Sequence, residues 1–186
     1  MPKDETERLP EEPKFTGPTE PTGCDATWAA ALPDATQLGV EHGDTVHTWT
    51  YNRRSFSLKW GFRSDGEKQT SLQFLAGLRA RISNDSYACY ILNDPYLDRI
   101  HELSDKLLDL YGTEGNSEYA RFLLAFIQSY PYVHDPKCPT DWPRFPSEYL
   151  LNSGGDCEDS SIALVALLTM SGFDAAFLQM KGHLAV

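Results

Sequence analysis

The chain has 186 residues, 41% of them hydrophobic and 12% aromatic, which is enough to bury a core as one domain. Its 27 acidic and 16 basic residues give a net charge of −11, which argues against nucleic acid or an anionic membrane as a partner. No run reaches the length of a membrane helix, and the N-terminus lacks the apolar stretch of a signal peptide. We therefore expect a soluble, by default cytoplasmic protein, whose oligomeric state stays open.

The distribution of prolines and large apolar residues divides the chain into three parts. Residues 1–25 hold five prolines among mixed charges and few large apolar side chains, which indicates a disordered tail. We assign 26–94 to an accessory hairpin and helix region and 95–186 to the core.

Four widely spaced cysteines form no CxxC motif, so neither a zinc motif nor a disulfide framework is visible. In an exported protein, pairing among Cys24, Cys89 and Cys138 stays open.

Hydrophobic periodicity predicts the elements of the accessory region. Phe56, Leu58, Trp60 and Phe62 alternate with polar residues or glycine, as in a half-buried strand. Leucines at helical spacing follow, from Leu72 onward. In chain order, the patterns predict strands at 46–51 and 56–62, a turn at 64–66, a helix at 69–83, and a strand or a helix at 87–92.

Two further helices are expected before the most informative stretch. One begins at Asn93-Asp94-Pro95 and stops near Gly112, and the second runs from about 117 to 129 with Asn116 or Ser117 as its cap. A proline-rich loop spans 134–147. Its aromatic residues, Trp142 and Phe145, either form a wall of a cleft or pack within a structural loop, and the sequence leaves these alternatives open.

Gly154-Gly155-Asp156-Cys157-Glu158-Asp159 precedes an apolar run that ends at Ser171-Gly172. We predict a loop that delivers Cys157 to the first turn of a buried helix, with Ser153 or Asp156 as the cap. Exposed amides at a helix start stabilise a thiolate, the nucleophilic form of cysteine. His183 follows a short strand-like run at 175–180. A cysteine at a helix start and a histidine on a following strand are typical of thiol-dependent acyl transfer, although an inert buried cysteine is the alternative.

The stretch from Pro146 through Gly-Asp-Cys-Glu-Asp, the apolar helix and Gly182-His183 resembles the transglutaminase-like superfamily. It is most similar to archaeal transglutaminase-like domains, and its core motif also resembles bacterial transglutaminase-like cysteine proteinases. The resemblance covers about 95–186. It implies an α+β, papain-like fold in which the helix starting at Cys157 packs on an antiparallel sheet, with its first strands at about 174–180 and 183–186.

The resemblance also implies site residues. Cys157 is the nucleophile and His183 the base, so His47, His101 and His134 are dispensable. The oxyanion is expected to meet the backbone amide of Cys157 and a side-chain donor, with Gln128 as first choice and Tyr132 as second. In the superfamily an aspartate on a later strand orients the histidine, and no residue here matches it. Either the sequence is a fragment, or the orienting group comes from elsewhere, or the protein is inactive, and we favour a truncated sequence. We expect this form to be weakly active or inactive and prone to associate through the strand edge at 183–186.

Metal binding is left as an alternative. In the resembling bacterial proteinases, acids around this motif bind calcium, which would assign Asp156 and Glu158 as ligands here; capping of the helix explains the same acids without an ion. His134, Asp135 and Cys138 form a weaker candidate cluster. The chemistry itself requires no cofactor.

These residues predict an enzyme that forms a thioester from a peptide or glutamine amide in a protein or peptide substrate. Water as second substrate makes it a cysteine peptidase or amidase, which we favour, and an amine makes it an acyltransferase. The alternative is a non-catalytic transglutaminase-like binding domain.

Overall fold

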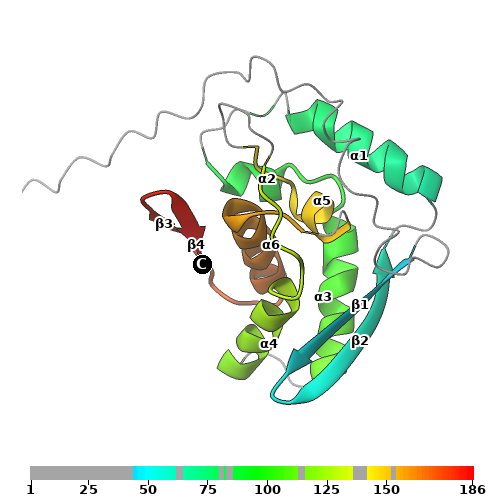
Figure 1. Cartoon of the computed structure of the whole chain (residues 1–186), viewed down its shortest axis with the longest axis vertical. Coiled ribbons are helices and arrows are strands. Elements are labelled where there is room, and N and C mark those ends of the chain that lie inside the picture. The colour runs from blue at the N-terminus through cyan, green and yellow to red at the C-terminus, as the bar shows by residue number, and fades with distance from the viewer. Residues whose placement is uncertain are drawn as a thin grey trace, which may run out of the picture.

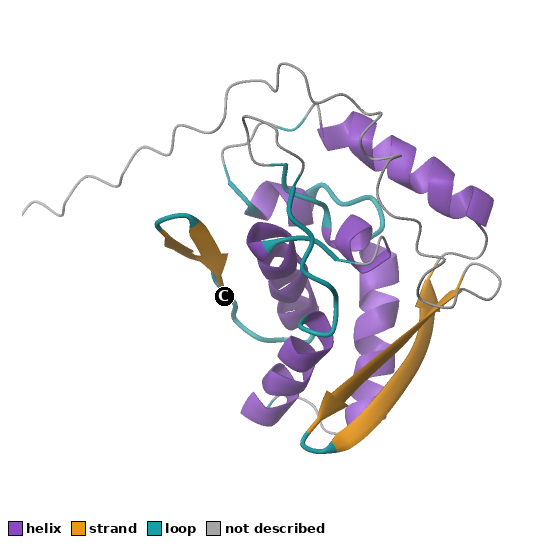
Figure 2. Ribbon diagram, viewed as in Figure 1, coloured by secondary structure: helices purple, strands orange, loops and turns teal. Residues whose placement is uncertain are grey.

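The computed structural model describes residues 44–61, 65–79, 82, 86–112, 116–135, 142–151 and 154–186. The predicted tail at 1–25 lies outside these residues. The described part is an α+β fold of helices and two small antiparallel sheets (Figures 1 and 2). Its elements are β1 (Asp44–Tyr51), β2 (Arg54–Gly61), α1 (Asp65–Arg79), α2 (Ala88–Leu92), α3 (Leu97–Tyr111), α4 (Ser117–Ile127), α5 (Pro146–Leu151), α6 (Cys157–Met170), β3 (Leu178–Met180) and β4 (His183–Ala185).

The first hairpin confirms the two predicted strands. β1 pairs with β2 in the register Tyr51↔Arg54, so a two-residue turn joins them. Asn52 and Arg53 have φ values of 48° and 61°, as a turn matching the twist of the strands requires. The inward-facing residues of the hairpin, Trp49, Leu58 and Trp60, join the main hydrophobic core. The hairpin lies beside α3 and α4, on the side of the molecule away from β3 and β4 (Figure 1).

The centre of the molecule is α6, which contacts α3, α4, α5 and β4. Its residues from Ser161 to Leu167 are all buried, so the prediction of a core helix with almost no polar face is confirmed. Facing side chains of α3 and α4 complete the core: Ile100, Leu103, Leu107, Phe122, Leu123 and Phe126. Along the part of the chain that the structure describes, no helix is long and apolar enough to cross a membrane.

Several predicted boundaries are wrong. The first helix spans Asp65–Arg79 instead of 69–83, so the residues of the predicted turn at 65–66 are helical. The ambiguous segment at 87–92 is the short helix α2. Helix α3 begins at Leu97, two residues after Pro95, and ends before Gly112, whose φ of 87° suits glycine. Asn116 caps α4 as predicted, by accepting a hydrogen bond from the Tyr119 amide at 2.8 Å.

The segment before α6 also differs from expectation. It contains the helix α5, which the sequence did not indicate. Trp142 and Phe145 are 6% and 0% exposed, and neither lines the cavity beside Cys157, which favours the packed structural loop over the cleft wall. The predicted strand at 174–180 is reduced to Leu178–Met180, which pairs with His183–Ala185 through Met180↔His183.

A buried histidine in the first hairpin makes stability dependent on pH. Burial lowers the pKa of His47 to about 4. The unfolded chain, with a histidine pKa of about 6.5, binds the extra proton first. The free energy of unfolding should therefore fall as pH drops from 6.5 towards 4, with His47 contributing on the order of 3 kcal/mol.

Urea unfolding of the wild type and of His47→Gln across this pH range tests the expectation. The difference between the two slopes of unfolding free energy against pH gives the contribution of His47. Buried carboxyls with raised pKa values act in the opposite direction, but they are present in both proteins and cancel in this comparison. His101→Gln is the matched control, since the side chain of His101 is 63% exposed. Identical slopes for the wild type and His47→Gln would contradict the expectation.

Candidate active site

Two glycines shape the loop that leads into α6. Gly154 has a φ of 116°, and a Cβ there would collide with the carbonyl oxygen of Pro131. A Cβ on Gly155 would collide with the carboxylate of Asp159. The close approach lets Gly155 accept a hydrogen bond from the Val133 amide at 2.9 Å and form a parallel bridge with Tyr132. The glycines thus bring the segment after α4 against the start of α6.

Helix α6 begins at Cys157, as predicted, with Asp156 as its N-cap. Asp156 and Asp159 form a capping box, in which the Asp156 amide donates to the Asp159 carboxylate at 3.2 Å. Ser153, the other predicted cap, lies outside the described residues. The cap places the thiol on the first turn of the helix.

A buried ion network holds the loop and the helix together. Arg144 is fully buried, and its guanidinium pairs with Asp159 and, at 3.2 Å, with Asp135. The Arg144 amide also donates to Asp159 at 2.6 Å. Burial raises the pKa of Asp159 to about 7, and the Arg144 charge opposes this shift. Sequence reasoning missed this network: the spacing of Asp156 and Asp159 signals a capping box, but nothing local marks Arg144 as its partner.

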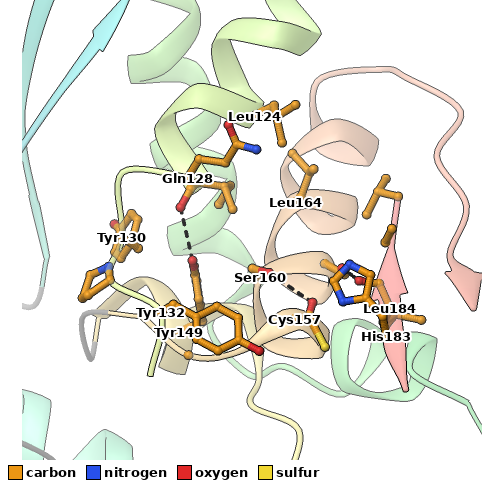
Figure 3. Close-up of a pocket in the computed structure, with 16 residues that line it drawn as sticks. Leu124, Gln128, Tyr130, Tyr132, Tyr149, Cys157, Ser160, Leu164, His183 and Leu184 are labelled. Atoms are coloured by element: carbon orange, nitrogen blue, oxygen red, sulfur yellow. Dashed lines mark hydrogen bonds between the residues drawn. The ribbon is translucent and has the colours of Figure 1, made fainter. Parts of the chain in front are cut away.

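Strand β4 docks on the first turns of α6 through a side-chain hydrogen bond. The Ser161 hydroxyl donates to the carbonyl of Leu184 at 3.1 Å. The Leu184 backbone lies close enough to Cys157 to oppose the rise of its pKa. His183 is the neighbouring residue of β4, and it lines the same cavity as Cys157 (Figure 3).

The charge state of the thiol differs from the expectation for a helix start. The Cys157 sulfur donates to the Glu158 carboxylate at 3.2 Å. Burial raises the pKa of Cys157; Glu158 and Asp156 add to the rise, and the Leu184 amide opposes it. The expected stabilisation of the thiolate is thus outweighed in this structure, because the thiol is part-buried beside two acids.

Cys157 and His183 line one cavity of about 430 Å³ between α4, α6 and β4. Gln128 and Tyr132, the two predicted oxyanion donors, line it as well. Figure 3 shows the Tyr132 ring beside Cys157, whereas Gln128 lies farther up the same wall. The second choice from sequence is therefore nearer the thiol than the first.

The other described histidines lie elsewhere. His47 is buried in the first hairpin, where its Nδ1 is 2.8 Å from the Tyr130 hydroxyl. His101 is paired with Asp105 at 3.4 Å on the exposed face of α3. The His134 ring packs against Tyr132, with centroids 4.9 Å apart. None of the three lines the cavity.

Three acids form a cluster at the start of α6. Ligand oxygens of Asp135, Asp156 and Glu158 all lie within 4.8 Å of one another. Asp156 Oδ1 and Glu158 Oε1 are buried and lack a hydrogen-bond partner. Burial raises the pKa of Glu158 to about 9, and the neighbouring charges of Asp159 and Asp156 add to the rise. Orphaned buried carboxylate oxygens fit a hard cation such as calcium. The weaker predicted cluster contributes only Asp135, since Cys138 lies outside the described residues.

A scan against protein-family models, a search of curated proteins and a search of solved structures each found no match to this chain.

Proposed function

We propose that the chain is a transglutaminase-like, papain-like thiol acyl-transfer enzyme that acts as a cysteine peptidase or amidase. The observation that carries the proposal is that Cys157, at the start of α6, and His183, on β4, line one cavity. The hydrogen bond from the Ser161 hydroxyl to the Leu184 carbonyl holds the two elements in this arrangement.

In the proposed reaction, the His183 imidazole takes the thiol proton, and the sulfur attacks the carbonyl carbon of an amide. The backbone amide of Cys157 and the Tyr132 hydroxyl, or the Gln128 side chain, stabilise the developing oxyanion. The C–N bond then breaks as the imidazolium gives its proton to the leaving amine, which leaves a thioester. Water, or an amine in the acyltransferase variant, releases the acyl group and returns the thiol.

In this proposal, a calcium ion would be bound by Asp135, Asp156 and Glu158. The ion would supply positive charge beside the first turn of α6. Calcium at 100 times its Kd should stabilise the fold by about 2.7 kcal/mol, which a calcium titration followed by thermal unfolding would detect. Asp156→Asn with Glu158→Gln should abolish the shift, and Arg121→Gln, at an exposed position, should keep it. A wild-type melting temperature that is the same with and without millimolar calcium would contradict the assignment.

A Cys157-dependent cleavage assay tests the function. The protein is incubated with a peptide library, with and without a primary amine, and the products are identified by mass spectrometry. We expect new peptide termini, or amine adducts, that are absent with Cys157→Ala. Cys89→Ala, which changes the other described free cysteine, serves as the matched control. Products that persist with Cys157→Ala would reject the proposal.

A second candidate is a non-catalytic binding domain. It is favoured by the hydrogen bond from the Cys157 thiol to Glu158, which keeps the sulfur protonated. Among the described residues, none forms a hydrogen bond with the His183 imidazole. A library that yields no cleavage and no amine adduct, yet leaves peptides bound to the protein, would favour this candidate.

A further inference from the structure

We propose that the cavity beside Cys157 is a specificity pocket for an uncharged, branched aliphatic or aromatic side chain next to the reacting carbonyl. This inference rests on the proposed function, because it assigns part of the substrate to the cavity wall. Its volume of about 430 Å³ lies in the range of pockets that bind small ligands. Such a pocket has room for a leucine or phenylalanine side chain.

Three elements each contribute an apolar side chain to the wall of the cavity. Leu124 comes from α4, Leu164 from α6 and Leu184 from β4, and Figure 3 shows Leu124 and Leu164 above the thiol and Leu184 to its side. None of the 16 residues that line the cavity is Asp, Glu, Lys or Arg. A charged substrate side chain would therefore find no counter-charge, apart from the base His183 itself.

The hydroxyl groups of the wall are already engaged. Tyr149 donates to the Ile127 carbonyl at 3.2 Å, and the Tyr130 hydroxyl lies 2.8 Å from His47. The Ser160 and Ser161 hydroxyls donate to backbone carbonyls at 3.0 and 3.1 Å. Burying a polar or charged group without a partner is costly, so these walls reject such groups and accept apolar ones. Gln128 and Tyr132 are left for the reacting carbonyl.

The rates at which peptidyl chloromethyl ketones alkylate Cys157 measure this side-chain preference directly. In this reaction the Cys157 sulfur displaces chloride to form a C–S bond, and the thiol proton passes to solvent. The probes are acetyl-Gly-X chloromethyl ketones with X as Leu, Phe, Gly, Lys or Glu, and adducts at Cys157 are counted by peptide mapping. Each rate is divided by the rate with iodoacetamide. We expect Leu and Phe to react at least about tenfold faster than Gly, Lys and Glu.

A charge placed in the wall should change the preference. Leu124 is 36% exposed, so Leu124→Lys introduces the cation at the rim of the cavity. It should raise the Glu-to-Leu rate ratio by about tenfold. Leu110→Lys is the matched control, because Leu110 is 37% exposed on α3 and does not line the cavity.

The two proposals fail in different ways. Chloromethyl ketones alkylate an accessible thiol without turnover, so a preference for Leu and Phe without any peptide cleavage would reject the proposed function and keep the pocket. Equal rates across the series, or a Leu124→Lys result that matches Leu110→Lys, would overturn the pocket assignment even if cleavage is observed.

Discussion

Replacing His183 with alanine should lower Cys157-dependent peptide cleavage by about 10⁴-fold or more, because the thiol then lacks the base that removes its proton. Burial and two neighbouring acids raise the pKa of Cys157, so the thiol is poorly ionised without assistance. Alkylation by iodoacetamide at pH 6–7 should therefore also slow. Both rates are measured on the same preparations, with circular dichroism to establish that the variant is folded.

His101→Ala is the matched control for this experiment. His101 is an exposed histidine on α3 that does not line the cavity, so its loss should leave both rates unchanged. His47 is less suitable as a control, because its removal changes the core. A fall in alkylation rate with His101→Ala but not with His183→Ala would overturn the pairing of Cys157 with His183.

Of the proposed substitutions, removing Arg144 should lower the free energy of unfolding the most. Its side chain is fully buried, and it pairs with Asp159 and Asp135. Arg144→Ala would leave the Asp159 carboxylate buried without its counter-charge, and breaking a buried pair in this way costs about 3–5 kcal/mol. The free energy of unfolding from urea titration measures the loss. The Cys157 loop should loosen as well, because Asp159 also caps α6.

The matched control is Arg121→Ala. Arg121 forms an exposed pair with Glu118 at 2.7 Å, and exposed pairs contribute less than about 1 kcal/mol. Similar losses for the two variants would show that the Arg144 network contributes no more than a surface ion pair. Arg144→Lys distinguishes charge from geometry, since lysine keeps the charge but cannot reproduce the two-carboxylate contact.

The sequence by itself predicted the elements whose signals are local. The period of two in 56–62 indicated a strand, Asn116 indicated a helix cap, and the run after Cys157 indicated a buried helix. The start of α6 was also predictable, because a capping residue and an apolar period lie within a few positions of each other. The spacing of Cys157 and His183 then led to the pair that the structure brings to one cavity.

Only the tertiary structure decided the features that depend on distant contacts. Helix α5 has six residues and follows a proline-rich loop, so its stability comes from packing against α6 and not from its own sequence. Tyr132 reaches the thiol because its segment forms a bridge with Gly155, 23 positions along the chain. Arg144 meets Asp159 inside the protein, where burial also reverses the pKa shift expected for Cys157. The burial of these polar groups depends on contacts between distant segments, so it is decided by the packed molecule and not by the residues beside them in the sequence.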